Sequence, residues 1–132
     1  MGLYNFKKRF VPFVLNGSKT HTIRALRAHP DKPGNTLHLY TGLRTKNVRL
    51  LMRVPCVKVE EIMITFVLGK PMVAIEGVEL SASELDAFAK RDGFPKGWQE
   101  MQEFWGEAGR AFPWVGQVIH WKRPAPGGRT AP

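Results

Sequence analysis

The chain has 132 residues, of which 43% are hydrophobic, and carries a formal net charge of +9 at pH 7. This length and apolar content predict one domain with a sizeable core. No apolar run reaches the roughly 18 residues of a membrane span, and residues 1–10 lack the apolar core of a signal peptide. The only cysteine, Cys56, excludes an internal disulfide and is expected to be a small buried hydrophobe. We expect a cytoplasmic protein with no membrane segment, and we favour a monomer.

The first half of the chain predicts one short helix followed by strands. A helix over residues 11–16 is favoured by Pro12 in its first turn and by Gly17 at the position of a C-terminal cap. Alternating and β-branched residues then predict strands. These strands cover residues 19–26, 36–42 and 48–67, and the last is interrupted near Pro55.

The second half predicts a hairpin, two helices and a last strand. Gly77 supplies the turn of the hairpin, and Ser81 with Glu84 forms a capping box at the start of the first helix. The second helix has aromatic residues at helical spacing, which favours core packing over base stacking. The hairpin covers residues 71–81, the two helices 81–94 and 97–109, and the last strand 115–122. The aromatic helix carries Trp98, Met101, Phe104 and Trp105.

This order of elements predicts an α+β fold. Short strands with intervening helices fit a small, mostly antiparallel β-barrel of about five or six strands, decorated by about three helices. We expect this domain to cover residues 1–122. Residues 123–132 are rich in Pro and Gly and predict a disordered tail.

The positive charge is concentrated in the first half of the chain. Residues 1–59 contain twelve Lys or Arg and one acid, Asp31, whereas the rest of the chain is slightly acidic. A basic face of this kind is the electrostatic feature that a polyanion recognises. We therefore expect RNA, another nucleic acid or a phosphorylated ligand as the partner.

Common catalytic and cofactor motifs are missing from the sequence. The four histidines have no zinc-like spacing and no second cysteine joins them, so we expect neither a metal nor a cofactor. No nucleophile elbow and no glycine-rich phosphate loop is present. The histidines are His21, His29, His38 and His120.

The segment "GSKTHTIR", residues 17–24, remains as the candidate site. One interpretation is a solvated basic strand, with Lys19 beside the C-terminus of the preceding helix. In the other, Lys19 belongs to the turn before the strand, and Lys19, Thr22 and Arg24 line one cavity. A buried Lys among cations has a lowered pKa and could activate a Thr hydroxyl as a nucleophile. The pattern alone leaves both interpretations open.

The chain resembles the ASCH family of small PUA-like β-barrels over residues 4–122. The family's G-x-K-x-x-T-x-R segment is matched by Gly17, Lys19, Thr22 and Arg24, and "PGNTLHLY" and "FAKRDGF" follow it. Residues 97–114 are an addition relative to the compact hydrolases of this family. The resemblance implies a cleft, between barrel and helices, for RNA or a nucleobase derivative.

The resemblance also implies roles for individual residues. One bacterial branch hydrolyses N4-acetylcytidine, and in its pattern Lys19 would be the base, Thr22 the nucleophile and Arg24 a cation of the cleft. Asp92 stands near the position of the family's catalytic Glu; alternatively, it caps a helix end or pairs with Arg24. The residues expected to bind ligand or nucleic acid are Gly17, Lys19, Thr22, Arg24, Arg27, Tyr40 and Arg44.

Three functions are therefore compared. The first is an RNA-binding domain with a cationic cleft for a nucleobase or nucleoside. The second is a hydrolase, either an amidohydrolase of N4-acetylcytidine that uses Lys19, Thr22 and Asp92 or, less favoured, a ribonuclease. The third is a protein-binding adaptor, which would require an exposed apolar patch around Trp98, Phe112 and Trp114.

Overall fold

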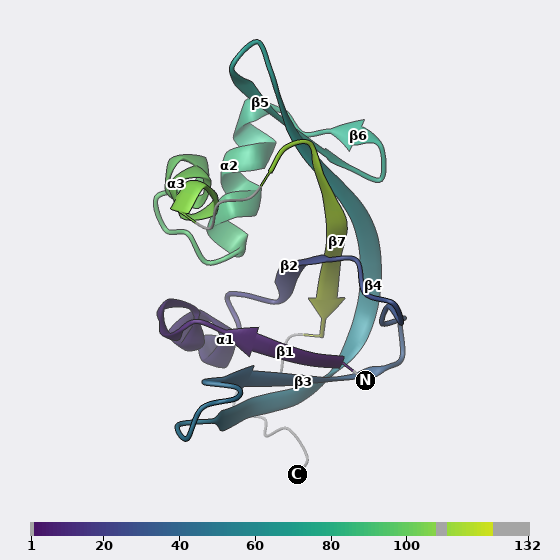
Figure 1. Cartoon of the computed structure of the whole chain (residues 1–132), viewed down its shortest axis with the longest axis vertical. Coiled ribbons are helices and arrows are strands. Elements are labelled where there is room, and N and C mark those ends of the chain that lie inside the picture. Colours follow the sequence, from purple (N-terminus) through teal and green to yellow (C-terminus); the bar gives the residue numbers. More distant parts are fainter. Residues whose placement is uncertain (1, 108–110, 123–132) are drawn as a thin grey trace.

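One long strand, β4 (Arg49–Val67), connects the two halves of the sheet (Figure 1). In the computed structural model, which describes residues 2–107 and 111–122, β4 is strongly curved. Its first half pairs antiparallel with β3 (Thr36–Thr41). Its second half pairs antiparallel with β7 (Trp114–Trp121) on one edge and with β5 (Lys70–Ile75) on the other.

Three shorter strands complete a seven-stranded sheet. β1 (Gly2–Phe6) pairs parallel with β3, β2 (His21–Ala25) antiparallel with β7, and β6 (Val78–Glu79) antiparallel with β5. The turn between β5 and β6 falls at Glu76 and Gly77, both at positive φ, as the sequence predicts. The α+β class and the mostly antiparallel sheet are thereby confirmed.

Within residues 2–107 and 111–122, three α-helices are present where the sequence predicts them. α1 (Val11–Asn16) follows a 3₁₀ turn, η1 (Lys8–Phe10), and ends at Gly17. α2 (Ala82–Arg91) begins with the predicted capping box, and α3 (Trp98–Glu107) packs beside it. Figure 1 shows α2 and α3 above the level of β1 and α1, on the same side of the curved sheet.

The predicted closed barrel is wrong. The pairings give a row β1-β3-β4-β7-β2, and within residues 2–107 and 111–122 no backbone ladder joins its two ends. Arginine side chains bridge the ends instead. Arg24 Nη2 donates to the carbonyl of Asn5 at 2.7 Å, and Arg27 Nη2 donates to the carbonyl of Leu3 at 2.7 Å. The sheet is open between β1 and β2, and arginine side chains, not a backbone ladder, satisfy these two carbonyls of β1.

Strand β1 is the element that the sequence analysis missed. The predicted strands begin only at residue 19. In the structure, Tyr4 and Phe6 alternate with the exposed Asn5, and both aromatic side chains lie in the core. The alternation over residues 3–6 carried the strand signal.

The core confirms several predictions about individual side chains. Cys56 is buried, and Met101 and Trp105 of the aromatic helix pack in the core. Of the three residues of the expected apolar patch, Trp98 and Trp114 are half-buried against the same core, and Phe112 is 37% exposed. The predicted tail, residues 123–132, lies outside the described residues, and the single domain over residues 1–122 stays a prediction.

Candidate functional site

A cavity of about 170 Å³ lies between the β1–η1 segment on one side and the C-terminal end of α2 with α3 on the other. It combines aromatic rings with polar and charged groups. The lining residues are Asn5, Phe6, Lys7, Phe10, Lys19, Thr22, Ile23, Arg24, Asp92, Phe94, Phe104 and Trp105. Three of the four motif residues and Asp92 therefore meet in one place.

Lys19 reaches the cavity because it belongs to a turn and not to the strand. Gly17 adopts φ of 82° at the end of α1, and the backbone N–H of Lys19 donates to the carbonyl of Phe13. Strand β2 begins only at His21. The turn thus places Lys19 on the same cavity as Thr22 and Arg24, which agrees with the second interpretation of the motif.

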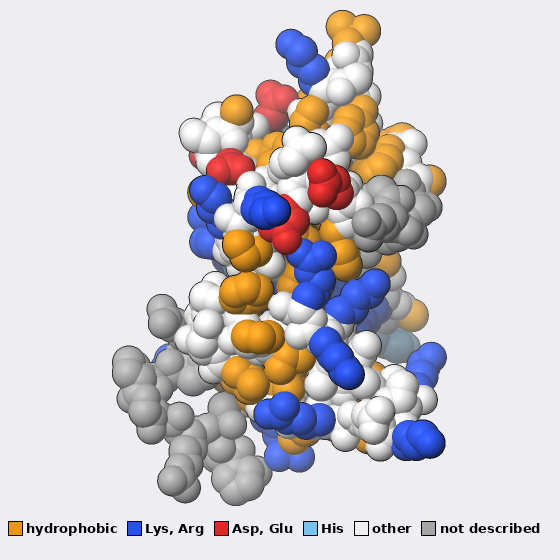
Figure 2. Space-filling model, turned by 90° about the vertical axis from the view of Figure 1, so that its left-hand side faces the viewer, with side chains coloured by type: hydrophobic (Ala, Val, Ile, Leu, Met, Phe, Trp, Pro, Cys, Tyr) orange, Lys and Arg blue, Asp and Glu red, His pale blue; other side chains and the backbone are white. Residues whose placement is uncertain are grey.

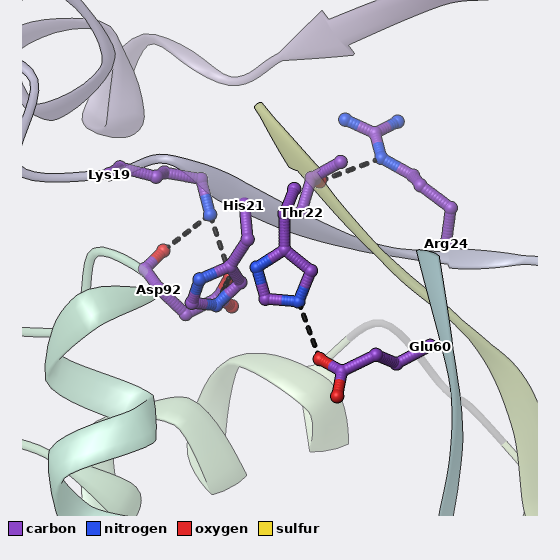
Figure 3. Close-up of polar contacts among 7 residues, drawn as sticks. Lys19, His21, Thr22, Arg24, Glu60 and Asp92 are labelled. Carbon is purple, nitrogen blue, oxygen red and sulfur yellow. Dashed lines mark hydrogen bonds and ion pairs between the residues drawn. The ribbon is translucent and has the colours of Figure 1, made fainter. Parts of the chain in front are cut away.

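Lys19 and Asp92 form a buried ion pair (Figure 3). The Lys19 ammonium donates to Asp92 Oδ1 at 2.7 Å and to the Asp92 backbone carbonyl at 2.6 Å. Asp92 is also the C-cap of α2. The expected role as a helix cap is therefore observed together with the pairing to Lys19. Lys19 is only 3% exposed and Asp92 5%, so solvent screens the pair little.

Burial and pairing act in opposite directions on these two groups. Burial lowers the pKa of Lys19 below its usual range, although the Asp92 carboxylate opposes this change. Burial pushes the pKa of Asp92 upward, but the ion pair with Lys19 and the His21 ring beside the carboxylate overcome it and leave the pKa below its ordinary value. The carboxylate is therefore held in its ionised form beside a lysine that burial makes easier to deprotonate.

Thr22 and Arg24 project from β2 into the same cavity. Arg24 Nε donates to Thr22 Oγ1 at 2.9 Å, and its guanidinium lies 5.1 Å from the centre of the Phe6 ring and 5.4 Å from that of Tyr4. These contacts place a fixed positive charge next to the Thr22 hydroxyl oxygen. A fixed cation at that point stabilises negative charge that develops on the oxygen.

Three phenylalanines form the apolar wall of the cavity. The rings of Phe10, Phe94 and Phe104 lie 5.4–5.6 Å apart in edge or tilted contacts. Arg9 lies over all three rings at 5.1–5.4 Å and pairs with Glu100 of α3. These contacts tie η1 to α3 and fix the width of the cavity.

Gly93 allows the wall to approach Asp92. Its φ is +104°, and a Cβ atom at this position would lie 2.8 Å from Phe10 Cδ1 and 3.5 Å from Lys19 Cδ. The residue after Asp92 must therefore be small as well as left-handed. In the segment "FAKRDGF", Gly93 therefore lets Phe10 and Lys19 lie close to Asp92 at the wall of the cavity.

Four of the predicted binding residues do not line the cavity. Gly17 shapes the turn after α1, and Arg27 is engaged with the carbonyl of Leu3. Tyr40 is half-buried on β3, and Arg44 is exposed in the loop between β3 and β4. Conversely, the phenylalanine wall was not among the predicted site residues, because its three rings come from separate segments and only the fold brings them together.

Basic side chains gather on one face of the molecule, and some of them line the cavity. On the face shown in Figure 2, Asp and Glu side chains appear only in the upper half, while Lys and Arg continue through the middle and lower parts. Lys7 and Arg24 line the cavity itself. An anionic ligand would therefore meet the cavity from a positive surface.

Neither a metal site nor a membrane span is found in the described part of the chain. Across residues 2–107 and 111–122, no group of three or more His, Cys, Asp or Glu side chains is arranged to hold a metal ion. In the same residues, no helix is long and apolar enough to cross a bilayer.

The site defines a class of binding pocket: a small cationic cavity with aromatic walls and one buried ion pair. Comparisons of the chain with protein-family models, with curated proteins and with solved structures found no match. The resemblance to the ASCH family thus stays a prediction from the motifs.

Proposed function

We propose that this chain is an ASCH-type, PUA-like domain that binds a nucleobase or nucleoside, within RNA or free, in the cavity. The composition of the cavity carries the proposal. Its volume of about 170 Å³ is below the roughly 300–1,000 Å³ of pockets for drug-sized ligands, so it suits a group of the size of one base. Aromatic rings for stacking and donors for hydrogen bonds are the two elements of single-stranded base recognition.

The buried pair provides a defined donor for such a base. An ammonium group has three N–H donors, and two of those of Lys19 are directed to Asp92. The third is available for a carbonyl oxygen of a ligand in the cavity. Lys7 and Arg24, at the same cavity, would hold a sugar or phosphate oxygen outside it.

Binding to RNA should be tested together with its salt dependence. We expect a short single-stranded RNA to bind and to lose affinity steeply as salt rises, because phosphate contacts release counterions. Trp105 lines the cavity and supplies an intrinsic fluorescence signal. The variant Lys7→Met should weaken binding, whereas Lys70→Met, an exposed charge on β5, should not. A flat salt response, or equal loss in both variants, would contradict the proposal.

A second candidate function is the hydrolysis of N4-acetylcytidine. It is favoured by one observation: the Thr22 hydroxyl, the Arg24 guanidinium and the Lys19–Asp92 pair line the same cavity. With Lys19 as the neutral amine, the form that burial favours, the Thr22 oxygen would attack the acetyl carbon while its proton passes to that amine. The C–N bond then breaks, cytidine leaves with that proton on its amino nitrogen, and water hydrolyses the acetyl-threonine ester to acetate and regenerates Thr22.

Turnover can be separated from binding with two variants of one residue. Thr22→Val keeps the shape of the side chain but has no hydroxyl, so it should abolish release of cytidine and acetate. Thr22→Ser keeps the hydroxyl and should retain turnover. If the valine variant is as active as the wild type, Thr22 is not the nucleophile. If neither wild type nor serine variant turns over the substrate, binding without catalysis is the remaining function.

A further inference from the structure

A histidine outside the lining of the cavity contacts the same carboxylate oxygen as Lys19. His21 Nε2 lies 3.1 Å from Asp92 Oδ1, and His21 is buried, with 3% of the residue exposed. His21 is the first residue of β2, whereas Thr22 and Arg24, the next positions of the motif, line the cavity. The histidine thus reaches the candidate site only through Asp92.

The imidazole of His21 is fixed by ring contacts and by a second polar pair. It stacks on Phe88 of α2, with ring centres 4.9 Å apart and 12° between the planes. On β7, the cross-strand partner His120 lies 5.5 Å away, centre to centre. His120 Nε2 is 2.7 Å from Glu60 Oε1 of β4. Figure 3 shows His21 beside the Lys19–Asp92 pair, with Glu60 on the far side of the His21 ring.

Packing alone does not account for a histidine at this position. A phenylalanine ring would stack on Phe88 without a polar atom to bury. Among the described residues, His21 Nε2 has no well-aligned hydrogen-bond acceptor, and its near polar neighbour is the Asp92 carboxylate. A buried nitrogen without a partner is costly, and the cost is reduced only if its N–H is directed to that carboxylate.

We propose that His21 is a positioning residue: it holds the Asp92 carboxylate so that Lys19 presents its remaining N–H to the cavity, and His120 with Glu60 supports the His21 ring. The first part is a property of the folded chain alone. Only its consequence for a ligand rests on the proposed function. The titratable and charged groups around His21, from the turn before β2, the end of α2, β7 and β4, are Lys19, Asp92, His120, Glu60 and Lys58.

The proposal predicts a shift in the titration of Asp92 that a purely structural role would not cause. His21 is one of the groups that keep the pKa of Asp92 low. Carbon-13 NMR of the Asp92 carboxyl should show its midpoint raised in His21→Phe, because an aromatic ring stays and the donor is lost. In His21→Gln, whose amide restores a donor near the position of Nε2, the midpoint should return most of the way.

A matched control separates positioning from packing. Phe88→Leu removes the stacking partner but leaves the His21 nitrogen, so it should move the Asp92 midpoint less than His21→Phe does. An unchanged midpoint in His21→Phe, or an equal shift in Phe88→Leu, overturns the proposal. If His21→Phe does not fold, His21→Gln decides alone, because a midpoint far above the wild-type value in spite of the amide donor also overturns it.

The ligand arm uses cytidine as the probe. If cytidine binds the wild type, His21→Phe should weaken binding several-fold and His21→Gln should restore it, which supports the consequence for Lys19. If cytidine does not bind the wild type while the carboxyl midpoint still moves in His21→Phe, the proposed function fails and the positioning of Asp92 stands. Binding of equal strength in both variants and wild type would overturn the effect on the cavity.

Discussion

The Lys19 ammonium contacts Asp92 twice, through a carboxylate oxygen at 2.7 Å and through the backbone carbonyl at 2.6 Å, although 73 positions separate the two residues. The contact joins the turn before β2 to the end of α2. Both atoms of Asp92 accept from one donor, so α2 cannot move away from β2 without exposing a buried charge. The ion pair therefore belongs to the stability of the fold as well as to the candidate site.

Removing one member of this pair should destabilise the protein strongly. In Lys19→Met the Asp92 carboxylate stays buried without its cation, and in Asp92→Leu the ammonium loses its anion. Each loss is expected to cost about 3–5 kcal/mol of unfolding free energy. The double variant should cost much less than the sum, since neither charge is then left unpaired. Urea unfolding of the four proteins measures the coupling, and additive effects would contradict it.

Asp92 should also make the protein less stable in acid. Its pKa in the folded state lies below the ordinary value of 3.8, so the unfolded chain binds more protons between these two values. The contribution of Asp92 is complete above pH 3.8 and is lost as the pH falls through the folded-state pKa. Thermal unfolding from pH 2 to 7 should show a flatter acid limb in Asp92→Asn, whereas Glu79→Gln, at an exposed site on β6, should follow the wild type.

The pair of His120 and Glu60 gives a prediction near neutral pH. Burial lowers the pKa of His120 below 6.5, and Glu60 partly compensates by accepting a hydrogen bond from its ring. Proton NMR of the His120 ring should therefore give a midpoint below 6.5. Glu60→Gln removes the compensating charge and should lower the midpoint further. A rise in that variant would show that Glu60 does not contact His120 in solution.

The sequence predicted local structure better than it predicted closure of the sheet. The caps at Gly17 and Ser81 are local signals: α1 ends at Gly17, and α2 begins after Ser81. Closure of the sheet into a barrel would require a backbone ladder between β1 and β2. The alternation of residues within each strand does not show whether such a ladder forms. The side chains of Arg24 and Arg27 take that place in the structure.

The candidate site was predictable in part for a related reason. Lys19 and Thr22 belong to one motif, and the sequence predicts that both line one cavity if Lys19 lies in a turn. In the structure β2 begins only at His21, and both residues line the cavity. The resemblance pointed to Asp92. His21 and His120 could not be paired from the sequence, because their contact requires the register between β2 and β7.

The arginine bridges predict a local change in stability at the edge of β1. Arg27→Met removes the donor to the Leu3 carbonyl and the cation 4.1 Å from the centre of the Tyr4 ring. Amide hydrogen exchange in β1 should speed up, with little change in the helices. Because Arg27 does not line the cavity, RNA binding should change less than in Arg24→Met. Equal binding losses in the two variants would mean that the edge of β1, and not the Arg24 side chain in the cavity, controls the site.

Gly93 offers the most direct test of the cavity wall. In Gly93→Ala the new methyl group meets Phe10 Cδ1 at 2.8 Å, in addition to the strain of a φ of +104°. Gly34→Ala is a matched control, since its φ is +96° and no atom lies within 4 Å of the added methyl group. The control should lose about 1–2 kcal/mol of unfolding free energy from backbone strain alone. Gly93→Ala should lose about 1–3 kcal/mol more from the contact with the ring, and the difference is measured by urea unfolding. Equal losses in the two variants would mean that Phe10 moves aside at no cost and that the wall of the cavity is not rigid.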